Sequence, residues 1–531
     1  MHITKFLTLG AITMSLAACQ GPQNDWFTQY EAMIPSKPSQ MQYGALYGGE
    51  TPITTDADTH RISVLLPLTG DNAATGRTIR SSIELAVLQR GPKNLSVSFY
   101  DTATGTTEAI NSAISTNPEI IIGPLFAADA RALRNMKPDA MPVISFTSDA
   151  TAIGNGIMTM ALMPSNSVEA IVSEMSADGT RQFVILAPDT NSGRLMAAAA
   201  RSAATNADMP VSGVFFYKEH NAESIKNAGH RASMYAARSA ANTRAREILS
   251  DILTNERLTA VEKSSLTRQL NRISKSETLG KLPYDAVLFL GTADDAKSLA
   301  SYLRYYGVGT REARFYGTAM WDGTDAASDF TLSGAKFAAL PEMNAGFANT
   351  YEQTTGTAPS RLATFGYDAT NLAMGMIYSD KSNAAYLLDP SGYIGIDGLF
   401  RLKPAGASER ALRIVELDGS GSMRTVKAPP ADFFAPMYNI EQTSLAPARE
   451  MPLESPGINP LNYIQIPDRV RSKYKAKTYG ANATQPETVA QQNVMTILPE
   501  DDSEVITNPD FQPVSLESVG RTYIDSVEIN E

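Results

Sequence analysis

From residue 61 onward, short and largely apolar runs alternate with segments of helical periodicity, and this alternation constrains the fold more than any other feature. Residues 62–66, 120–122 and 183–187 are such runs, and each is too short for a helix. Residues 78–90, in contrast, place apolar side chains on one helical face. Short strands without polar alternation are typical of parallel sheets that helices cover on both faces. We therefore predict an α/β fold, and the amount of sheet indicates two lobes.

Two stretches break this alternation. Residues 221–279 lack strand signals, and Thr259 with Glu262 has the spacing of a capping box, so we predict a helical insertion in the second lobe. Lys and Arg outnumber Asp and Glu there, which indicates either a solvated helical face or a docking surface for an acidic partner. Residues 429–531 are rich in Pro, Gln and Asn and acidic at 500–502. We expect a low-complexity, largely disordered tail, which either only solubilises the protein or carries short docking motifs, as at 461–467.

The N-terminus has the three parts of an export signal. Lys5 is followed by the apolar run 6–18, which is too short to cross a bilayer, and small residues then precede Cys19, the only cysteine. The segment resembles the lipobox of bacterial lipoproteins, although an ordinary signal peptide with a chance cysteine stays open. The resemblance implies a signal peptide at 1–18 and lipid on Cys19, followed by a flexible tether at 19–59. Gln20, where inner-membrane lipoproteins carry Asp, implies the outer membrane and the periplasm.

Composition and missing motifs exclude several classes of function. The net charge of -11 argues against nucleic-acid binding, and a single cysteine allows no disulfide. The chain has four histidines and no HExxH motif, paired cysteines or Asp-rich calcium loop, so we predict no metal and no cofactor. The loop at 70–78 has five residues between its glycines where a phosphate loop needs four. A GxSxG elbow is also missing, and we predict that the protein is not an enzyme.

Several segments, in this order, resemble the type I periplasmic-binding-protein fold of the branched-chain amino-acid binding proteins: 61–87, 119–133, 141–151, 182–203, 284–307 and 364–378. The resemblance implies parallel sheets sandwiched by helices in two lobes. We assign residues 60–164 and 341–395 to lobe I. Lobe II then comprises residues 165–340 and 396–428, including the helical insertion.

A lipid anchor on this fold resembles the penicillin-binding-protein activator lipoproteins of the LppC/LpoA type. The resemblance implies an outer-membrane lipoprotein that regulates peptidoglycan synthesis by binding a penicillin-binding protein or a related cell-wall enzyme. The alternative is the solute-binding lipoprotein of an ABC transporter for amino acids or another small ligand.

In this fold, ligands bind between the lobes, where parallel strands end. The sequence predicts cleft positions at Thr69, Gly70, Phe126, Ala127, Thr147, Ser148, Asn191, Ser192, Thr292 and Asp322. By the resemblance, Ala127 stands in place of a ligand-binding serine, and Ser192 and Thr292 lie near positions that carry aromatic walls. The acid that holds the ligand ammonium falls near Met320, close to Asp322. Because an unpaired buried ammonium is costly, we infer that a free amino acid is not the ligand. The cleft is then either a scaffold or a site for another small ligand, such as a cell-wall fragment.

Overall fold

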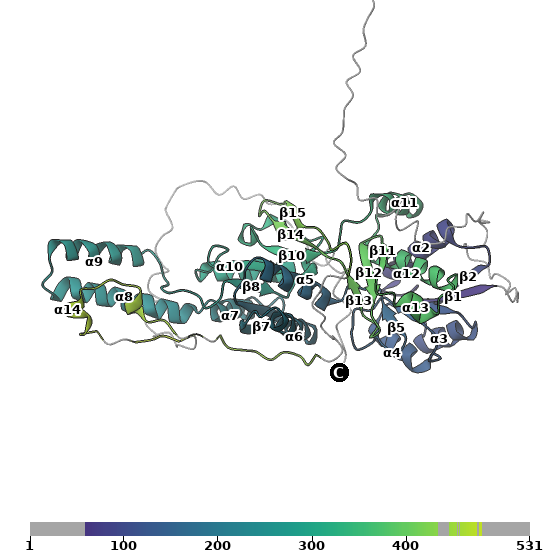
Figure 1. Ribbon diagram of the computed structural model, residues 1–531, viewed down its shortest axis with the longest axis horizontal. Coiled ribbons are helices and arrows are strands. Elements are labelled where there is room, and N and C mark those ends of the chain that lie inside the picture. The colour runs from purple at the N-terminus through teal and green to yellow at the C-terminus, as the bar shows by residue number, and fades with distance from the viewer. Residues whose placement is uncertain (1–58, 434–444, 454, 456, 475–476, 481–531) are drawn as a thin grey trace, which may run out of the picture.

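The computed structural model describes residues 59–433, 445–453, 455, 457–474 and 477–480. The predicted lipidation site Cys19, the signal at 1–18 and the tether, apart from its last residue, lie outside the described residues. Two α/β lobes and a helical hairpin follow one another along the longest axis of the molecule (Figure 1). Within the described part of the chain, no helix combines the length and the apolar character needed to cross a membrane.

Lobe I is built on a five-stranded sheet of order β2-β1-β3-β4-β5, in which all pairs are parallel. Its strands are β1 (His60–Leu66), β2 (Leu95–Asp101), β3 (Ile120–Ile122), β4 (Val143–Ser145) and β5 (Ile157–Thr159). Its helices are α2 (Ala73–Arg90), α3 (Thr106–Ser115), α4 (Ala127–Met136), α11 (Ala345–Thr355), α12 (Arg361–Ile377) and α13 (Asn383–Leu387). Helices α2 and α12 pack closely at Gly366, where a Cβ atom would lie 2.3 Å from Ser82 Oγ. The segments predicted as strands and helices thus assemble as the α/β pattern requires.

Lobe II contains a seven-stranded sheet of order β15-β14-β10-β9-β8-β6-β7. Its strands are β6 (Phe183–Pro188), β7 (Val211–Tyr217), β8 (Ala286–Phe289), β9 (Arg314–Gly317), β10 (Lys336–Ala339), β14 (Arg413–Leu417) and β15 (Met423–Lys427). Its covering helices are α5 (Pro164–Ala177), α6 (Asn191–Asn206), α7 (Ala222–Ala232) and α10 (Ala293–Tyr305), with the short turns η2 (Ala319–Trp321), η3 (Ala326–Ser328) and η4 (Phe330–Leu332). The central strands are parallel, but β14 and β15 run antiparallel at one edge. This antiparallel edge extends the parallel strands that we predict.

A third, small sheet lies between the lobes in the sequence. It is antiparallel and consists of β11 (Tyr393–Gly395), β12 (Gly398–Leu402) and β13 (Ser408–Arg410). The turn before its last strand adjoins lobe I, since Thr159 N of β5 donates to Gly406 O at 2.9 Å. The boundary that we predict between residues 395 and 396 therefore falls inside this sheet.

Arg410 anchors the region where the chain passes between the lobes. Its side chain is fully buried, with the guanidinium 4.4 Å from the ring centroid of Phe365 and 5.2 Å from that of Phe400. Its Nη2 donates to Met160 O at 2.6 Å, and its backbone N donates to Asn166 Oδ1 at 2.7 Å. A buried cation held by hydrogen bonds and aromatic faces fixes the arrangement of the strands that meet here.

The predicted insertion at 221–279 contains two different structures. Helix α7 at its start packs on α10 and helps to cover the lobe II sheet. Helices α8 (Tyr235–Asn255) and α9 (Ala260–Ile273) then form a hairpin that projects from the lobe at the far end of the molecule (Figure 1). Helix α9 starts with the predicted capping box, in which Thr259 and Glu262 bond each other's backbone N–H.

Part of the predicted disordered tail is ordered against lobe II and the hairpin. We call the described residues between 445 and 480 the C-terminal strap. It pairs Met451 with Val214 of β7, and it continues through η6 (Pro460–Asn462) and α14 (Asp468–Arg471). Its apolar side chains are buried against α8 and α9: Leu461, Ile464, Ile466 and Val470. The motif predicted at 461–467 therefore docks within its own chain.

Candidate functional site

The strand order of each sheet shows which strand ends contribute loops to a crevice between the lobes. In lobe I the order reverses between β1 and β3, and in lobe II it reverses between β6 and β8. Loops at the carboxyl ends of such strand pairs form the ligand crevice of open α/β sheets. Nine of the predicted positions follow strands in this way: Thr69, Gly70, Phe126, Ala127, Thr147, Ser148, Asn191, Ser192 and Thr292. Asp322 follows β9 and its short η2 turn.

On the lobe I side, the loop hydroxyls are bonded within their own lobe. Thr69 Oγ1 donates to Asp101 Oδ2 at 2.6 Å, while Asp101 Oδ1 accepts from the N–H groups of Leu68 and Ala103. Burial alone raises the pKa of Asp101, but these hydrogen bonds outweigh it and lower the pKa below its ordinary value. Thr147 is buried and accepts from the backbone N of Asp149 at 3.2 Å. These side chains therefore stabilise loops in the structure as it stands.

On the lobe II side, threonines cap the helices that start at the crevice. Thr292 Oγ1 accepts from Asp295 N at 3.3 Å at the start of α10. Thr190 accepts from Gly193 N at 3.0 Å at the start of α6, and Asn191 and Ser192 form the first turn of that helix. Each cap accepts a hydrogen bond from a backbone N–H group that could otherwise bind an anion. The two helix N-termini are thus already partly satisfied.

Asp322, the predicted partner for a ligand ammonium, already has a cation. Its Oδ2 lies 3.5 Å from Nη2 of Arg361, which stands at the start of α12 in lobe I. Burial raises the pKa of Asp322, and the charges of Arg361 and Arg413 oppose this rise. Arg361 also pairs with Asp397, whose carboxylate is fully buried and also bonded by Thr364. Arg361 therefore joins the two lobes and supplies the positive charge that a zwitterionic ligand would have to bring.

An aromatic core fills lobe II directly behind Asp322. Trp321 is fully buried between Phe289 and Phe337, with ring centroids 6.1 and 6.0 Å away. Its Nε1 donates to Gly291 O at 3.3 Å, so the polar end of the indole is satisfied at the carboxyl end of β8. A Cβ atom on Gly317 would lie 2.5 Å from the indole, which shows how closely β9 approaches the ring. Trp321 thus belongs to the core rather than to a wall of the crevice.

Within the part of the chain that the structure describes, no hydrogen bond or ion pair joins two of the ten predicted cleft residues. The sequence predicted their places at strand ends but missed Arg361 and Asp397. No local motif marks that pair, because the contact with Asp322 forms only when α12 of lobe I meets the loop after β9 of lobe II. The ten residues remain a prediction for ligand binding.

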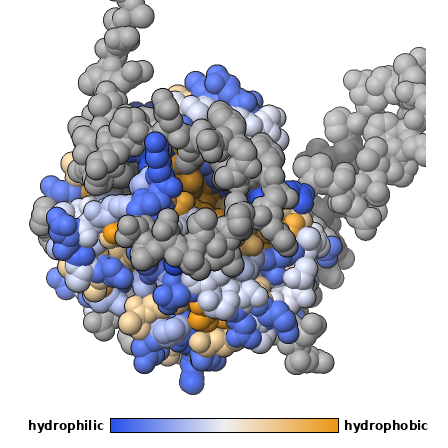
Figure 2. All heavy atoms as spheres, turned by 90° about the vertical axis from the view of Figure 1, so that its right-hand side faces the viewer, coloured by the Kyte–Doolittle hydropathy of each residue, from blue (hydrophilic) through white to orange (hydrophobic). Residues whose placement is uncertain are grey.

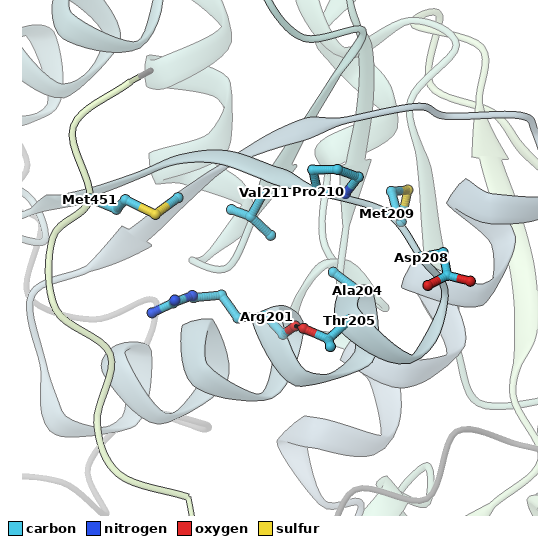
Figure 3. A pocket seen from close by; sticks show the side chains of 8 residues that line it. All are labelled: Arg201, Ala204, Thr205, Asp208, Met209, Pro210, Val211 and Met451. Carbon is cyan, nitrogen blue, oxygen red and sulfur yellow. Dashed lines mark hydrogen bonds between the residues drawn. The ribbon is translucent and has the colours of Figure 1, made fainter.

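A separate surface hollow lies away from these strand ends (Figure 3). It has a volume of about 370 Å³ and lies between the end of α6, the start of β7 and the strap residue Met451. Its walls are mostly apolar or aliphatic, with Arg201 and Asp208 at its sides.

Figure 2 views the lobe I end, where hydrophilic residues dominate the visible described surface and hydrophobic ones are scattered. Among the described residues, no group of three or more His, Cys, Asp or Glu side chains could hold a metal ion.

Comparison with known proteins finds a similarity to one family over part of the chain, and a shared fold. Residues 53–219 match the family described as "LppC putative lipoprotein". The chain is 28% identical over 151 residues to "Penicillin-binding protein activator LpoA" of Mannheimia succiniciproducens, which covers 27% of this chain. The match spans only 26% of the length of that relative.

Among solved structures, the chain is similar to a "putative branched-chain amino acid ABC transporter" protein of Rhodospirillum rubrum, with 16% identity and a TM-score of 0.51. That likeness covers 69% of this chain and 100% of the other, and it shows the two-lobed α/β fold. The C-terminal domain of Haemophilus influenzae LpoA, described as a regulator of PBP1A, matches with 16% identity, 69% and 99% coverage and a TM-score of 0.47. The predicted fold class is thus confirmed, and so is the resemblance to LppC/LpoA lipoproteins and branched-chain amino-acid binding proteins.

Proposed function

We propose that this chain, similar over residues 53–219 to the LppC lipoproteins, is a lipid-anchored regulator of peptidoglycan synthesis that binds a penicillin-binding protein. The observation that carries the proposal is the 28% identity over 151 residues with an LpoA activator. The matched residues 53–219 include all five strands of lobe I and the first two of lobe II. In this proposal the two-lobed body is the part that regulates the enzyme.

The occupied crevice supports protein binding over solute capture. A receptor for amino acids needs a free carboxylate for the ligand ammonium, whereas Asp322 faces Arg361 at 3.5 Å. Displacing Arg361 would leave the fully buried carboxylate of Asp397 without its cation, which costs several kcal/mol. We therefore propose that the crevice serves as a scaffold between the lobes and that the protein has no catalytic activity of its own.

We further propose that lipid on Cys19 holds the protein on the outer membrane, facing the periplasm, with residues 20–59 as a tether. A flexible segment of about 40 residues has a root-mean-square span of roughly 35 Å, so the folded body can stand off the membrane. This distance would let lobe I and lobe II reach an enzyme that works within the periplasm.

Affinity capture from solubilised cell envelopes tests this function, with the full lipidated chain as bait. We expect a penicillin-binding protein to be recovered at low salt and to be absent with an unrelated lipidated bait. Cys19→Ser should leave the membrane fraction while its purified body still captures the same enzyme. Recovery of transporter permease subunits and no cell-wall enzyme would contradict the proposal.

A further inference from the structure

Helix α9 and the turn that follows it carry exposed cations. We call the exposed side chains of Lys263, Arg268 and Arg272 on α9, together with that of Lys275 just after it, the basic face. The helix buries Leu266 and Ile273 in the hairpin core. No ion-pair partner of these four cations exists among the described residues, and Arg268 bonds only the hydroxyl of Ser264. The basic face is therefore a surface of uncompensated positive charge.

The acidic residues of the hairpin make their bonds to groups other than these four cations, Glu277 included, which accepts from Tyr235 Oη at 2.8 Å. Glu262 accepts from Arg469 and Glu256 pairs with Lys473, both cations of the C-terminal strap. Asp251 accepts from Tyr474 Oη at 2.6 Å. Glu247 pairs with Arg244 on α8 at 2.9 Å. The strap thus bonds three of the carboxylates of the hairpin, and the four exposed cations have no ion-pair partner among the described residues.

The strap also contacts α9 and the segment after it directly. Gln269 of α9 makes two hydrogen bonds to the backbone of Gln465, at 2.9 and 2.8 Å. Further along, Tyr479 pairs with Ile458 through two backbone hydrogen bonds. Ile458 in turn packs on Gly280, which follows α9 in the chain. The chain beyond residue 480 therefore starts at the foot of the hairpin.

That remaining segment has the complementary charge. Residues 481–531 contain ten Asp and Glu residues and one basic residue, Arg521. Four of the acids lie together at 500–504: Glu500, Asp501, Asp502 and Glu504. The 20 residue steps from 480 to 500 reach at most about 70 Å when fully extended, and a random coil of this length spans roughly 25 Å on average. Helix α9, with 14 residues, is only about 21 Å long, so the acidic segment can reach all of it.

We propose that the acidic segment 500–504 docks on the basic face of α9 in the same chain. For a tether of this length the effective concentration is on the order of 1 mM, so a dissociation constant of about 1 mM is enough to fill the face half of the time. An acidic partner at the hairpin must displace this segment, which makes the tail an internal competitor. This surface is independent of the proposed function of the lobes.

Carbodiimide cross-linking of the full purified chain tests the docking, because it joins a lysine amine to a carboxylate only when the two are in contact. We expect peptides that link Lys263 or Lys275 to the segment 500–504. In an equal mixture of isotopically light and heavy protein, these links should join peptides of the same isotope. Their yield should fall at least about fivefold from 50 mM to 500 mM salt, since the screening length falls from about 14 Å to about 4 Å.

Substituting the two arginines of the basic face tests the role of charge, because Lys263 and Lys275, which form the cross-links, stay in place. Arg268→Gln with Arg272→Gln should reduce the yield about fivefold. Arg77→Gln with Arg311→Gln, on exposed positions of the two lobes, should leave it unchanged. Links that join light to heavy chains would assign the face to a second copy and overturn the proposal. The absence of links, or equal links from Lys93 and Lys218, would overturn it as well.

Discussion

The crevice between the lobes and the hairpin at the end of lobe II differ in whether their charged side chains form ion pairs within the protein. In the crevice, Asp322 and the buried Asp397 share Arg361, so the charges that could recognise a ligand are compensated inside the protein. On α9, the exposed side chains of Lys263 and Arg268 have no ion-pair partner among the described residues. The difference is that charged side chains are paired with each other in the crevice, whereas those on α9 lack ion-pair partners among the described residues.

The largest effect should come from breaking the charge network of the crevice. Arg361→Met leaves the fully buried carboxylate of Asp397 without its cation, and we expect a loss of about 3 kcal/mol in the free energy of unfolding. Denaturant unfolding measures this loss. Adding Asp397→Asn to Arg361→Met should recover much of it, because the unpaired charge is then gone. A loss under about 0.5 kcal/mol, the range of the exposed control Arg311→Met, would contradict the internal compensation.

A smaller and local effect is expected where the strap meets the hairpin. Leu461 is buried against α8 and α9, and Leu461→Ala should cost about 2 kcal/mol of local stability. Hydrogen exchange should accelerate in α8, α9 and the strap but remain unchanged in β1 and β3 of lobe I. Uniform acceleration across both lobes would mean that the hairpin and the crevice do not behave as separate regions.

Acid should loosen the strap before it affects the core of lobe I. The hydrogen bond from Arg469 lowers the pKa of Glu262 to about 2, below its ordinary value of about 4.5. The contact therefore contributes fully above pH 4.5 and is lost as the pH falls from about 4.5 towards 2. Cleavage of the strap by an acid-stable protease should increase as the pH falls over this range. Glu262→Gln should make cleavage less dependent on pH, while the Glu256–Lys473 pair remains in both proteins.

The smallest effect should come from adding amino acids. Since Arg361 already compensates Asp322, free amino acids should not shift the thermal unfolding of the protein. A ligand that binds the native state at a hundredfold excess over its Kd would add about 2.7 kcal/mol, which is easily detected. A clear shift with any one amino acid would show that the crevice opens and that the compensation is incomplete.

The sequence predicted the parts of the fold that depend on local pattern. The apolar runs at 120–122 and 183–187 became β3 and β6, and the capping box at Thr259 starts α9 as expected. The antiparallel edge strands β14 and β15 and the small third sheet were missed, because short strands near 400–427 carry no regular apolar period. The ordered strap was missed as well, since its few apolar residues gain burial only against the hairpin.

The candidate site was predictable only in outline. Strand ends could be read from the chain, so the positions of Thr69 and Thr292 follow from pattern alone. Whether their polar groups are available depends on tertiary partners, as with Asp101 for Thr69 and Arg361 for Asp322. Such contacts join segments that are distant in sequence, and no spacing rule marks them.

Reconstitution with a purified penicillin-binding protein tests the central claim most directly. The rate of peptidoglycan synthesis from lipid-linked precursor is measured with and without the full chain. We predict a faster reaction at equimolar protein, unchanged by added amino acids and retained in a variant without residues 481–531. No change in rate with any captured synthase, together with tight binding of an amino acid by the chain, would contradict the account.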